Sequence, residues 1–439
     1  MHNNSVSYQK QIPVRYDVNV FVAGGGPAGV AAAVAAARQG ASVYLAEAGG
    51  SFGGSGTIGL VPSFAQFTDG VNFLAGGVGR EIFTRLYGEH CDYSRRFRPF
   101  SVEQLKVIYD EMVTKAGVQF TFFTRVVDTV AVDGKVNAVI LTSKSGLFAV
   151  RAKVYIDCTG DADLVEWAGG KTVYGDEKGV AMPTTLCSLW ANIDYSRIDQ
   201  PATSRLDDAF RDGVFSKEDR HIPGIQWTDP KKGIGGGNIG HIYEVDARDE
   251  HSLTQAMLEG RRTVREFERY YREYLHGYEE MHLCYTADLL GIRESRRIVG
   301  DYVLTGEDFV ARASFEDEIG RYAYPVDIHA MKPDSTAYAA FEKEYRTLRY
   351  GVGESYGIPY RVLIPKGLSN VLAAGRCVSC DRQMQASIRV MPGCFITGQA
   401  AGVAAAMASR LDGEVRRADV RALQDTLRAF GAYIPMVNE

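Results

Sequence analysis

A glycine-rich segment near the N-terminus has the residue types and spacing to bind a phosphate group. Gly24, Gly26 and Gly29 form a Gly-x-Gly-x-x-Gly pattern, and Pro27 and Ala28 lie between the last two glycines. An apolar run precedes the pattern and an alanine-rich run follows it, which predicts a buried strand, a tight turn and a helix. Backbone N–H groups and the positive end of the helix dipole would then face a pyrophosphate.

A carboxylate follows at the distance expected for a dinucleotide site. A second apolar run, 42–46, ends in Glu47 and Ala48, and Glu47 lies 23 positions after Gly24. This spacing is close to the ~20 positions typical of the carboxylate that accepts hydrogen bonds from an adenosine ribose. An accidental glycine-rich turn before a buried helix is the alternative.

Two further turns supply candidate ligand contacts. The loop 49–59 contains Gly53, Gly54, Ser55 and Thr57, and such backbone can approach a ligand closely, although it could also be a mobile surface loop. A strand-like run, 154–156, leads into the second turn, which contains Thr159, Gly160 and Asp161.

The periodicity of apolar residues predicts the elements that position these turns. Helical spacing covers 102–116 and a charged helix covers about 253–274. Strands are expected at 118–123, 126–132, 136–142 and 147–150, with hairpin turns at 133–135 and 144–146. The strand 154–156 then returns to the sheet.

Length and composition predict two domains. At 439 residues the chain exceeds the ~250–300 residues at which single cores usually stop growing. Residues 169–284 change in character and are predicted to form a substrate domain. We expect residues 1–168 and 285–439 to form one discontinuous nucleotide-binding domain, with substrate-domain segments around 306–360.

Charge, hydrophobic pattern and cysteine content predict which partners and which cellular compartment this chain has. The net charge of −5 and the pI of about 6.0 provide no basic field for nucleic acid. Glycines and a proline interrupt the uncharged run 18–37, which argues against a membrane span. The polar start, 1–16, predicts a cytoplasmic protein. Seven scattered cysteines suit reduced thiols, and no residues are assigned as metal ligands.

Five segments, in this order along the chain, resemble the FAD-dependent oxidoreductases of the glutathione-reductase-type flavoprotein superfamily. They are 24–29 with Glu47, 53–57, 156–161, 291–302, and 370–377 with 387–402. The resemblance implies tightly bound FAD and redox chemistry at the flavin. It also implies an α/β fold: a discontinuous, glutathione-reductase-like Rossmann domain with an inserted α+β substrate domain.

The same resemblance assigns roles around the cofactor. Thr57 would offer its hydroxyl group, Val127 would meet adenine through its backbone, and the turn 159–161 would pass beneath the pyrophosphate. The C-terminal segment adds Gly375, Arg376, Ser387, Ile388 and Arg389. After it, a helix opened by 392–393 and extending over about 394–408 would point its N-terminus at the pyrimidine edge of the isoalloxazine, where reduction develops negative charge.

Candidate catalytic residues are basic. Arg389 could stabilise reduced flavin or bind an anionic substrate, or it could form a structural ion pair. Arg293 is expected to face the cavity, whereas 296–297 are expected to be structural. His282 and His329 are acid/base candidates because histidine titrates near neutrality. Cys377 and Cys380 have the spacing of a redox dithiol, although the family does not keep the second cysteine.

The expected reaction follows from what the motifs include and lack. Residues 53–57 contain no histidine, which argues for non-covalent FAD. No second Gly-x-Gly-x-x-Gly follows a strand, so the hydride donor is expected to be the substrate, or a separate reductase supplies electrons. We expect hydride transfer between flavin N5 and a small polar organic substrate, with dehydrogenation of C–OH or C–N favoured. The alternatives are reduction of an activated C=C bond and, from another class, an FAD-binding RNA-modification or scaffold protein, against which the acidic balance counts.

Overall fold

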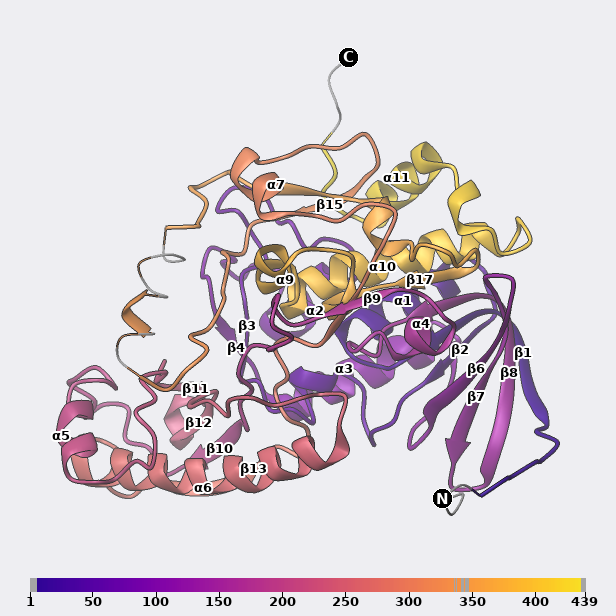
Figure 1. Cartoon of the computed structure of the whole chain (residues 1–439). Coiled ribbons are helices and arrows are strands. Elements are labelled where there is room, and N and C mark those ends of the chain that lie inside the picture. The colour runs from indigo at the N-terminus through magenta and orange to yellow at the C-terminus, as the bar shows by residue number, and fades with distance from the viewer. Residues whose placement is uncertain (1–5, 335, 337, 341–342, 344–346, 436–439) are drawn as a thin grey trace.

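The largest element of the fold is a seven-stranded sheet that takes strands from both ends of the chain (Figure 1). The computed structural model describes residues 6–334, 336, 338–340, 343 and 347–435. The strand order is β5-β2-β1-β8-β7-β6, and β17 pairs with β8. These strands are β1 (Val14–Ala23), β2 (Val43–Ala46), β5 (Gln119–Thr121), β6 (Arg125–Val132), β7 (Lys135–Ser143), β8 (Gly146–Asp157) and β17 (Val371–Ala373).

The parallel part of this sheet, β5-β2-β1-β8-β17, is the Rossmann portion, and the antiparallel strands β6 and β7 extend it as a meander. The predicted strands are confirmed with one correction. The separate strands expected at 147–150 and 154–156 are a single strand, β8. It stays continuous because its whole length is paired, with β7 at its start and with β1 and β17 further along.

Helices α1 (Pro27–Arg38) and α10 (Met391–Ala408) pack on one face of the sheet, and further helices pack on these two. They include α2 (Val78–Tyr87) and α3 (Val102–Lys115). Pro27 opens α1, where a missing N–H costs nothing. Small residues let α1 and α10 pack closely, because a Cβ at Gly398 or Gly402 would lie 2.2 Å from a carbonyl oxygen of α1. Within the described residues, α10 is the one helix long and apolar enough to cross a membrane, but 94% of it is buried inside the protein.

A second region has its own sheet and its own core. The antiparallel order is β11-β12-β10-β13, with β10 (Ser188–Ala191), β11 (Ile225–Asp229), β12 (Ile234–Gly237) and β13 (His282–Thr286). The long helix α6 (Glu250–Tyr274) runs beside this sheet with the short α5 (Leu206–Arg211), apart from the large sheet (Figure 1). Trp190, Phe267, Tyr270 and Tyr271 are fully buried in the core between them.

The remaining short elements lie outside the two large sheets, and some of them carry site residues. They are β3 (Ser63–Phe64), β4 (Arg98–Pro99), α4 (Asp163–Trp167), β9 (Thr172–Tyr174), β14 (Arg296–Ile298), α7 (Gly306–Ala311), β15 (Glu318–Tyr322), β16 (Tyr356–Pro359), α9 (Arg382–Ile388) and α11 (Val420–Ala429). Single 3-10 turns lie at Gly54–Gly56, Pro230–Lys232, Tyr360–Leu363, Gly375–Cys377 and Val415–Arg417.

Candidate active site

The turn between β1 and α1 has space and unused donors for a phosphate group. Gly24 has φ +90°, a conformation that L side chains rarely adopt. A Cβ at Gly26 would meet nothing within 4 Å, so the space above it is open. The first helical bond of α1 runs from Val30 N to Gly26 O at 3.0 Å, which leaves the N–H groups of Ala28 and Gly29 without an acceptor in the helix. The turn therefore fits the pyrophosphate of FAD.

Glu47, just after β2, binds backbone N–H groups of this turn and of the loop that follows Glu47. Its Oε2 accepts a hydrogen bond from Gly25 N and its Oε1 accepts one from Gly49 N, both at 2.6 Å. Burial raises the pKa of Glu47, and these two hydrogen bonds oppose the shift. A carboxylate has about four acceptor positions, so there is capacity left for a ribose hydroxyl. That contact stays a prediction, as does any role of the neighbouring Ala48.

The second glycine-rich loop lies against the first turn. Gly53 N donates to Gly25 O at 2.8 Å, and a Cβ at Gly54 would lie 3.3 Å from the Cα of Gly26. Ser55 is half-buried in the same loop. The two turns thus border one open space, which suits the pyrophosphate and ribityl side of the cofactor.

The predicted role of the Thr57 hydroxyl needs correction. Thr57 is fully buried, and its Oγ1 donates to Phe52 O at 2.6 Å. This bond closes the loop on itself, so the hydroxyl is committed to the fold rather than free for a ligand.

An ion pair stands at the predicted pyrophosphate turn after β8. Asp161 Oδ1 accepts from Arg376 Nη2 at 2.9 Å, and a Cβ at Gly160 would lie 2.7 Å from the same nitrogen. Thr159 donates its hydroxyl to the buried Asp157 at 2.7 Å. Arg376 Nη1 is buried and has no partner among the described residues. A phosphate oxygen would satisfy this nitrogen, which is a second feature that fits FAD.

The N-terminus of α10 also leaves donors unused. Val390 caps the helix, and the first helical bond runs from Cys394 N to Val390 O at 3.0 Å. Pro392 has no N–H, so the N–H groups of Met391 and Gly393 have no acceptor within the helix. These two groups, together with the helix dipole, are suited to a developing negative charge.

The other C-terminal residues predicted at the cofactor are packing residues. Gly375 has φ +85°, and a Cβ there would lie 2.9 Å from the Cβ of Ala28. Ser387 is buried with its Oγ bonded to Tyr324 O and the Tyr356 hydroxyl, and Ile388 is fully buried. Contact of these three residues with FAD stays a prediction, because their side chains are packed in the core.

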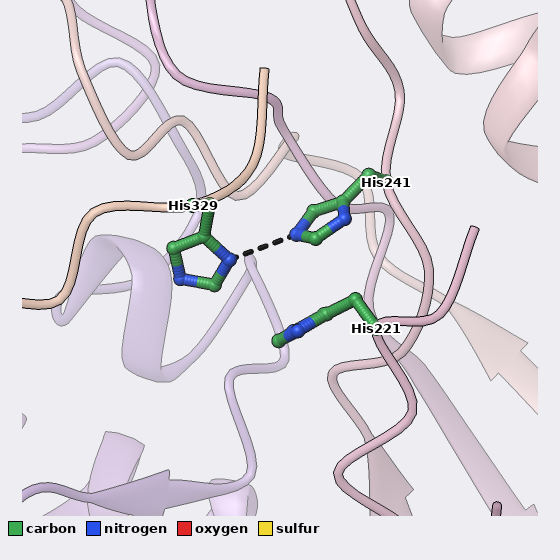
Figure 2. A group of neighbouring side chains, drawn as sticks. All are labelled: His221, His241 and His329. Atoms are coloured by element: carbon green, nitrogen blue, oxygen red, sulfur yellow. Dashed lines mark hydrogen bonds between the residues drawn. The ribbon is translucent and has the colours of Figure 1, made fainter. Parts of the chain in front are cut away.

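Three histidines from distant parts of the chain meet in one cluster (Figure 2). His221 precedes β11, His241 follows β12, and His329 follows β15. His241 Nε2 and His329 Nδ1 are 2.8 Å apart, and the ring of His221 stacks on that of His241 with centroids 4.2 Å apart. His241 is 3% exposed and His329 is 8% exposed, whereas His221 is half-buried.

Two carboxylates contact two of these imidazoles, each at the ring nitrogen that does not face the other histidine. Asp219 Oδ1 lies 3.1 Å from His241 Nδ1, and Asp327 Oδ2 lies 3.5 Å from His329 Nε2. The Tyr243 hydroxyl donates to the same Asp219 oxygen at 3.2 Å. Burial would raise the pKa of both carboxyl groups, but the groups around them together outweigh burial and hold both pKa values below their usual range. These groups are His241 and backbone N–H groups at Asp219, and His329, Arg389 and Arg293 at Asp327.

Burial keeps the imidazoles neutral. It lowers the pKa of His329 to about 3, with a further contribution from the nearby Arg293 guanidinium. Burial also lowers the pKa of His241, although Asp219 opposes it, and it holds the pKa of His221 well below its usual range. Neutral imidazoles have lone pairs that can accept a proton or bind a metal.

Two of the predicted arginines adjoin this cluster. Arg293 is 6% exposed, and its Nη1 donates to Pro183 O and to Thr185 Oγ1 at 3.0 and 2.8 Å. Burial and the like charge of Arg389 lower the pKa of Arg293 to about 10. Arg389 Nη2 donates to Asp327 O at 3.1 Å and lies 3.5 Å from its carboxylate. Arg389 therefore links the start of α10 to the histidine cluster.

A cavity of about 240 Å³ opens beside the cluster. The residues that line it include Arg96, His221, His241, Asp327, His329 and Arg349. Arg96 Nε is buried and has no hydrogen-bond partner in the described part of the chain. The cavity thus combines acid/base groups with positive charge, which suits a small polar or anionic molecule.

Three other candidates lie outside this arrangement. His282 is exposed at the start of β13, where it pairs with Ala191, so the predicted acid/base role has no support from its position. Val127 lies at an irregularity of β6, and its side chain is 38% exposed. Cys377 and Cys380 are unpaired and buried, and burial raises the pKa of both thiols, which disfavours the reactive thiolate.

Sequence reasoning missed most of the cluster. It named His329 but not His221, His241 or their carboxylate partners, because these residues are far apart in the chain. A signal was present, since Asp219-x-His221 and Asp327-x-His329 repeat one short pattern. Such a short repeat has little specificity until the fold brings both copies to one place.

Comparison with solved structures gives weak similarities. A geranylgeranyl bacteriochlorophyll reductase-like protein from Thermoplasma acidophilum aligns at 12% identity and a TM-score of 0.46, covering 95% of this chain and 82% of that chain. The p-nitrophenol 4-monooxygenase of Pseudomonas putida DLL-E4 aligns at 14% identity and a TM-score of 0.37, covering 65% and 70%. At these scores neither structure assigns an activity to this chain.

A search of curated proteins found no match. The comparison with family models, in contrast, matches residues 19–427 to the family described as FAD dependent oxidoreductase. That span contains both glycine-rich turns, the ion pair of Arg376 and the N-terminus of α10, whose open space and unused donors fit FAD. The chain belongs to the FAD-dependent oxidoreductase family.

Proposed function

We propose that this FAD-dependent oxidoreductase transfers a hydride between non-covalently bound FAD and a small polar organic substrate, oxidising a C–OH or C–N bond. The observation that carries the proposal is the cavity lined by neutral histidines and joined through Arg389 and Asp327 to the start of α10. The finer fold assignment is proposed with it: a glutathione-reductase-like Rossmann domain formed by 1–168 and 285–439, with a substrate domain at 169–284.

The cofactor contacts follow from the unused donors. Ala28, Gly29 and Arg376 would bind the pyrophosphate, and Glu47 would accept from the ribose. The N–H groups at the start of α10 would stabilise negative charge at the pyrimidine edge. When bound, FAD supplies a hydride acceptor at N5.

The residues at the cavity would handle the proton. In the proposed dehydrogenation the C–H bond breaks and its electron pair leaves with the hydride, while the O–H or N–H proton leaves the substrate and a C=O or C=N bond forms. His241 is held neutral by burial and has Asp219 behind it to stabilise its protonated ring, so His241 would take up that proton, whereas the pKa of about 3 makes His329 too weak a base for this step. Arg96 and Arg349 would orient a negatively charged part of the substrate.

One observation favours a second reaction. Burial and Arg389 lower the pKa of Arg293 to about 10, which makes this arginine a better proton donor than usual. Reduction of an activated C=C bond would use such a donor, with a hydride delivered to one carbon and the proton to the other.

Anaerobic reduction of the flavin separates the two reactions. Holoenzyme should lose its flavin absorbance when mixed with members of a panel of hydroxy acids, polyols and amino acids. If no alcohol or amine bleaches the flavin but the chemically reduced enzyme is reoxidised by unsaturated acids, the reductase is correct instead.

The cellular setting is part of the same proposal. We place the enzyme in the cytoplasm, with either the substrate or a separate electron donor or acceptor as its redox partner, and with no nucleic acid.

A further inference from the structure

His241 and His329 face each other through one pair of ring nitrogens, His241 Nε2 and His329 Nδ1, which are 2.8 Å apart. Asp219 lies 3.1 Å from His241 Nδ1 and favours the proton of His241 on that nitrogen, which leaves a lone pair on its Nε2. With its own proton on Nδ1, His329 donates a hydrogen bond to that lone pair. With its proton on Nε2, which lies 3.5 Å from Asp327, His329 offers a second lone pair, and the two lone pairs together can bind a positive charge.

The third histidine indicates which positive charge fits. A shared proton would bridge two nitrogens and make no use of His221. The ligating atoms of His221, His241 and His329 all lie within 4.8 Å of one another. Nitrogens that share one ion at metal–nitrogen distances of ~2.0–2.1 Å lie at most ~4.2 Å apart, so small movements of the rings would bring all three onto one ion. Figure 2 shows the three rings close together, with His241 and His329 facing each other across the dashed line and His221 edge-on beside them.

We propose that His221, His241 and His329 bind a divalent transition-metal ion such as Zn²⁺. Imidazole is a preferred ligand of these metals. Asp219 and Asp327 stand behind two of the imidazoles, which is the arrangement that fixes a ligand's tautomer in metal sites. The two carboxylates also supply negative charge, which neutral imidazoles lack. The sequence assigned no metal ligands, because positions 221, 241 and 329 are distant along the chain.

The site would be of the open kind. Three protein ligands leave at least one coordination position, and all three histidines line the cavity. The ion would bind a substrate hydroxyl or amino group there and ease the loss of its proton. This use rests on the proposed dehydrogenation, whereas the binding of the metal does not.

The number of metal ions bound per FAD can be measured directly. Holoenzyme is stripped with a chelator, dialysed to equilibrium against Zn²⁺ and, separately, Mn²⁺, and analysed for metal per FAD by mass spectrometry. We expect one Zn²⁺ per FAD in the natural protein and loss of that ion in His241→Ala and in His329→Ala. Asp219→Asn should weaken binding by about 10- to 100-fold. His276→Ala is the matched control, because His276 also faces a carboxylate, that of Asp199, but is exposed and alone.

The outcomes are distinct. If natural holoenzyme takes up no more Zn²⁺ than His241→Ala, the charge between the rings is a proton and the proposal is wrong. If the three single alanine variants of the cluster retain the ion, it binds elsewhere and the proposal is also wrong. Should an alanine variant fail to fold, Asp219→Asn and His221→Ala decide in the same way. Stoichiometric Zn²⁺ with no flavin bleaching by any alcohol or amine would keep the metal site and reject the dehydrogenase.

Discussion

Burial sets the chemistry of individual residues at the cavity. His329 has a pKa near 3, compared with the ordinary value of 6.5, because its ring is desolvated and lies near Arg293. The same burial leaves Arg293 with a pKa near 10. The neutral imidazole has the lone pair that binds a metal or a proton, and the lowered pKa of the charged Arg293 makes it easier for this guanidinium to give up a proton.

The lowered pKa of His329 predicts acid sensitivity. Above pH 6.5 the folded and unfolded chains are both neutral at this residue, so it adds no pH dependence. Below pH 6.5 the unfolded chain binds a proton that the folded chain excludes until about pH 3, so stability falls as the pH falls. Between pH 6.5 and 5 the loss is at most about 2 kcal/mol, from ~1.4 kcal/mol per pH unit.

Thermal unfolding midpoints from pH 8 to pH 5 test this. His329→Asn should reduce the acid-induced drop, whereas His276→Asn should leave it unchanged. An identical drop in His329→Asn and the natural protein would show that His329 is not the residue responsible.

Glu47 is expected to affect cofactor affinity more than turnover. Glu47→Ala removes the acceptor for Gly25 N and Gly49 N and the predicted ribose contact. FAD binding should weaken by about 1.5–3 kcal/mol, the range for hydrogen bonds to charged groups. Titration of apoprotein with FAD measures the loss, and the fully reconstituted variant should keep most of its turnover. An unchanged affinity would place the ribose carboxylate elsewhere.

Arg389 is expected to tune the flavin. Arg389→Met removes a positive charge at the start of α10, so reduced flavin should be less stable and the reduction potential lower. For a two-electron couple ~30 mV corresponds to ~1.4 kcal/mol. Potentiometric titration and stopped-flow reduction measure the effect while FAD remains bound. Arg269→Met, which breaks an exposed ion pair on α6, is the control. If both variants match the natural protein, Arg389 only pairs with Asp327.

At the scale of elements, the contact between α1 and α10 determines where the cofactor turn and the flavin-facing helix end lie. A Cβ at Gly402 would lie 2.2 Å from Ala32 O, a backbone atom that cannot move alone. The two helices must separate to admit any side chain there. Such a movement displaces the α1 turn, which carries the N–H groups of Ala28 and Gly29.

Gly402→Ala should therefore lower both stability and FAD content. Overpacking typically costs about 1–3 kcal/mol. Chemical denaturation and the ratio of flavin to protein absorbance measure the two effects. Gly351→Ala is a suitable control, because a Cβ there would come no closer than 3.4 Å to another atom. Equal FAD content in the two variants would contradict the proposed coupling.

At the scale of the molecule, one sheet is completed by distant parts of the chain. β17 pairs with β8 although more than 200 residues separate these two strands in the sequence. In the same way, α10 near the C-terminus packs on α1 near the N-terminus. The intervening chain forms the second sheet and delivers His221 and His241. The cavity is thus built where residues of both regions meet.

Purified protein should be yellow and should release intact FAD on acid or heat denaturation. Residues 53–57 contain no histidine for a covalent link. Because FAD binds the folded chain, it should also raise the unfolding temperature, with ~2.7 kcal/mol gained at 100 times its Kd. Absorbance of the supernatant after denaturation checks the release. Colourless protein that cannot be reconstituted, or flavin that stays attached, would contradict the assignment.

The sequence by itself determined the cofactor and most of the elements near it. Gly24, Gly26 and Gly29 are needed for local reasons, namely a backbone angle, an open space and a close approach, so their pattern can be recognised without the fold. The helix α3 and the strands of the hairpins follow in the same way from the period of their apolar residues. A structural requirement that acts between residues near each other in the chain leaves a pattern that can be recognised in the sequence.

The tertiary structure alone decided the chemistry of the cavity. His221, His241 and His329 carry no diagnostic spacing, and their low pKa values arise from burial, which no short pattern records. The sequence favoured the exposed His282 over the buried His329, because a histidine's role depends on what surrounds it and the sequence does not show this. Thr57 was misjudged for the same reason: its hydroxyl turns inward to Phe52 O. Proximity between distant segments creates this site, and only the folded chain supplies it.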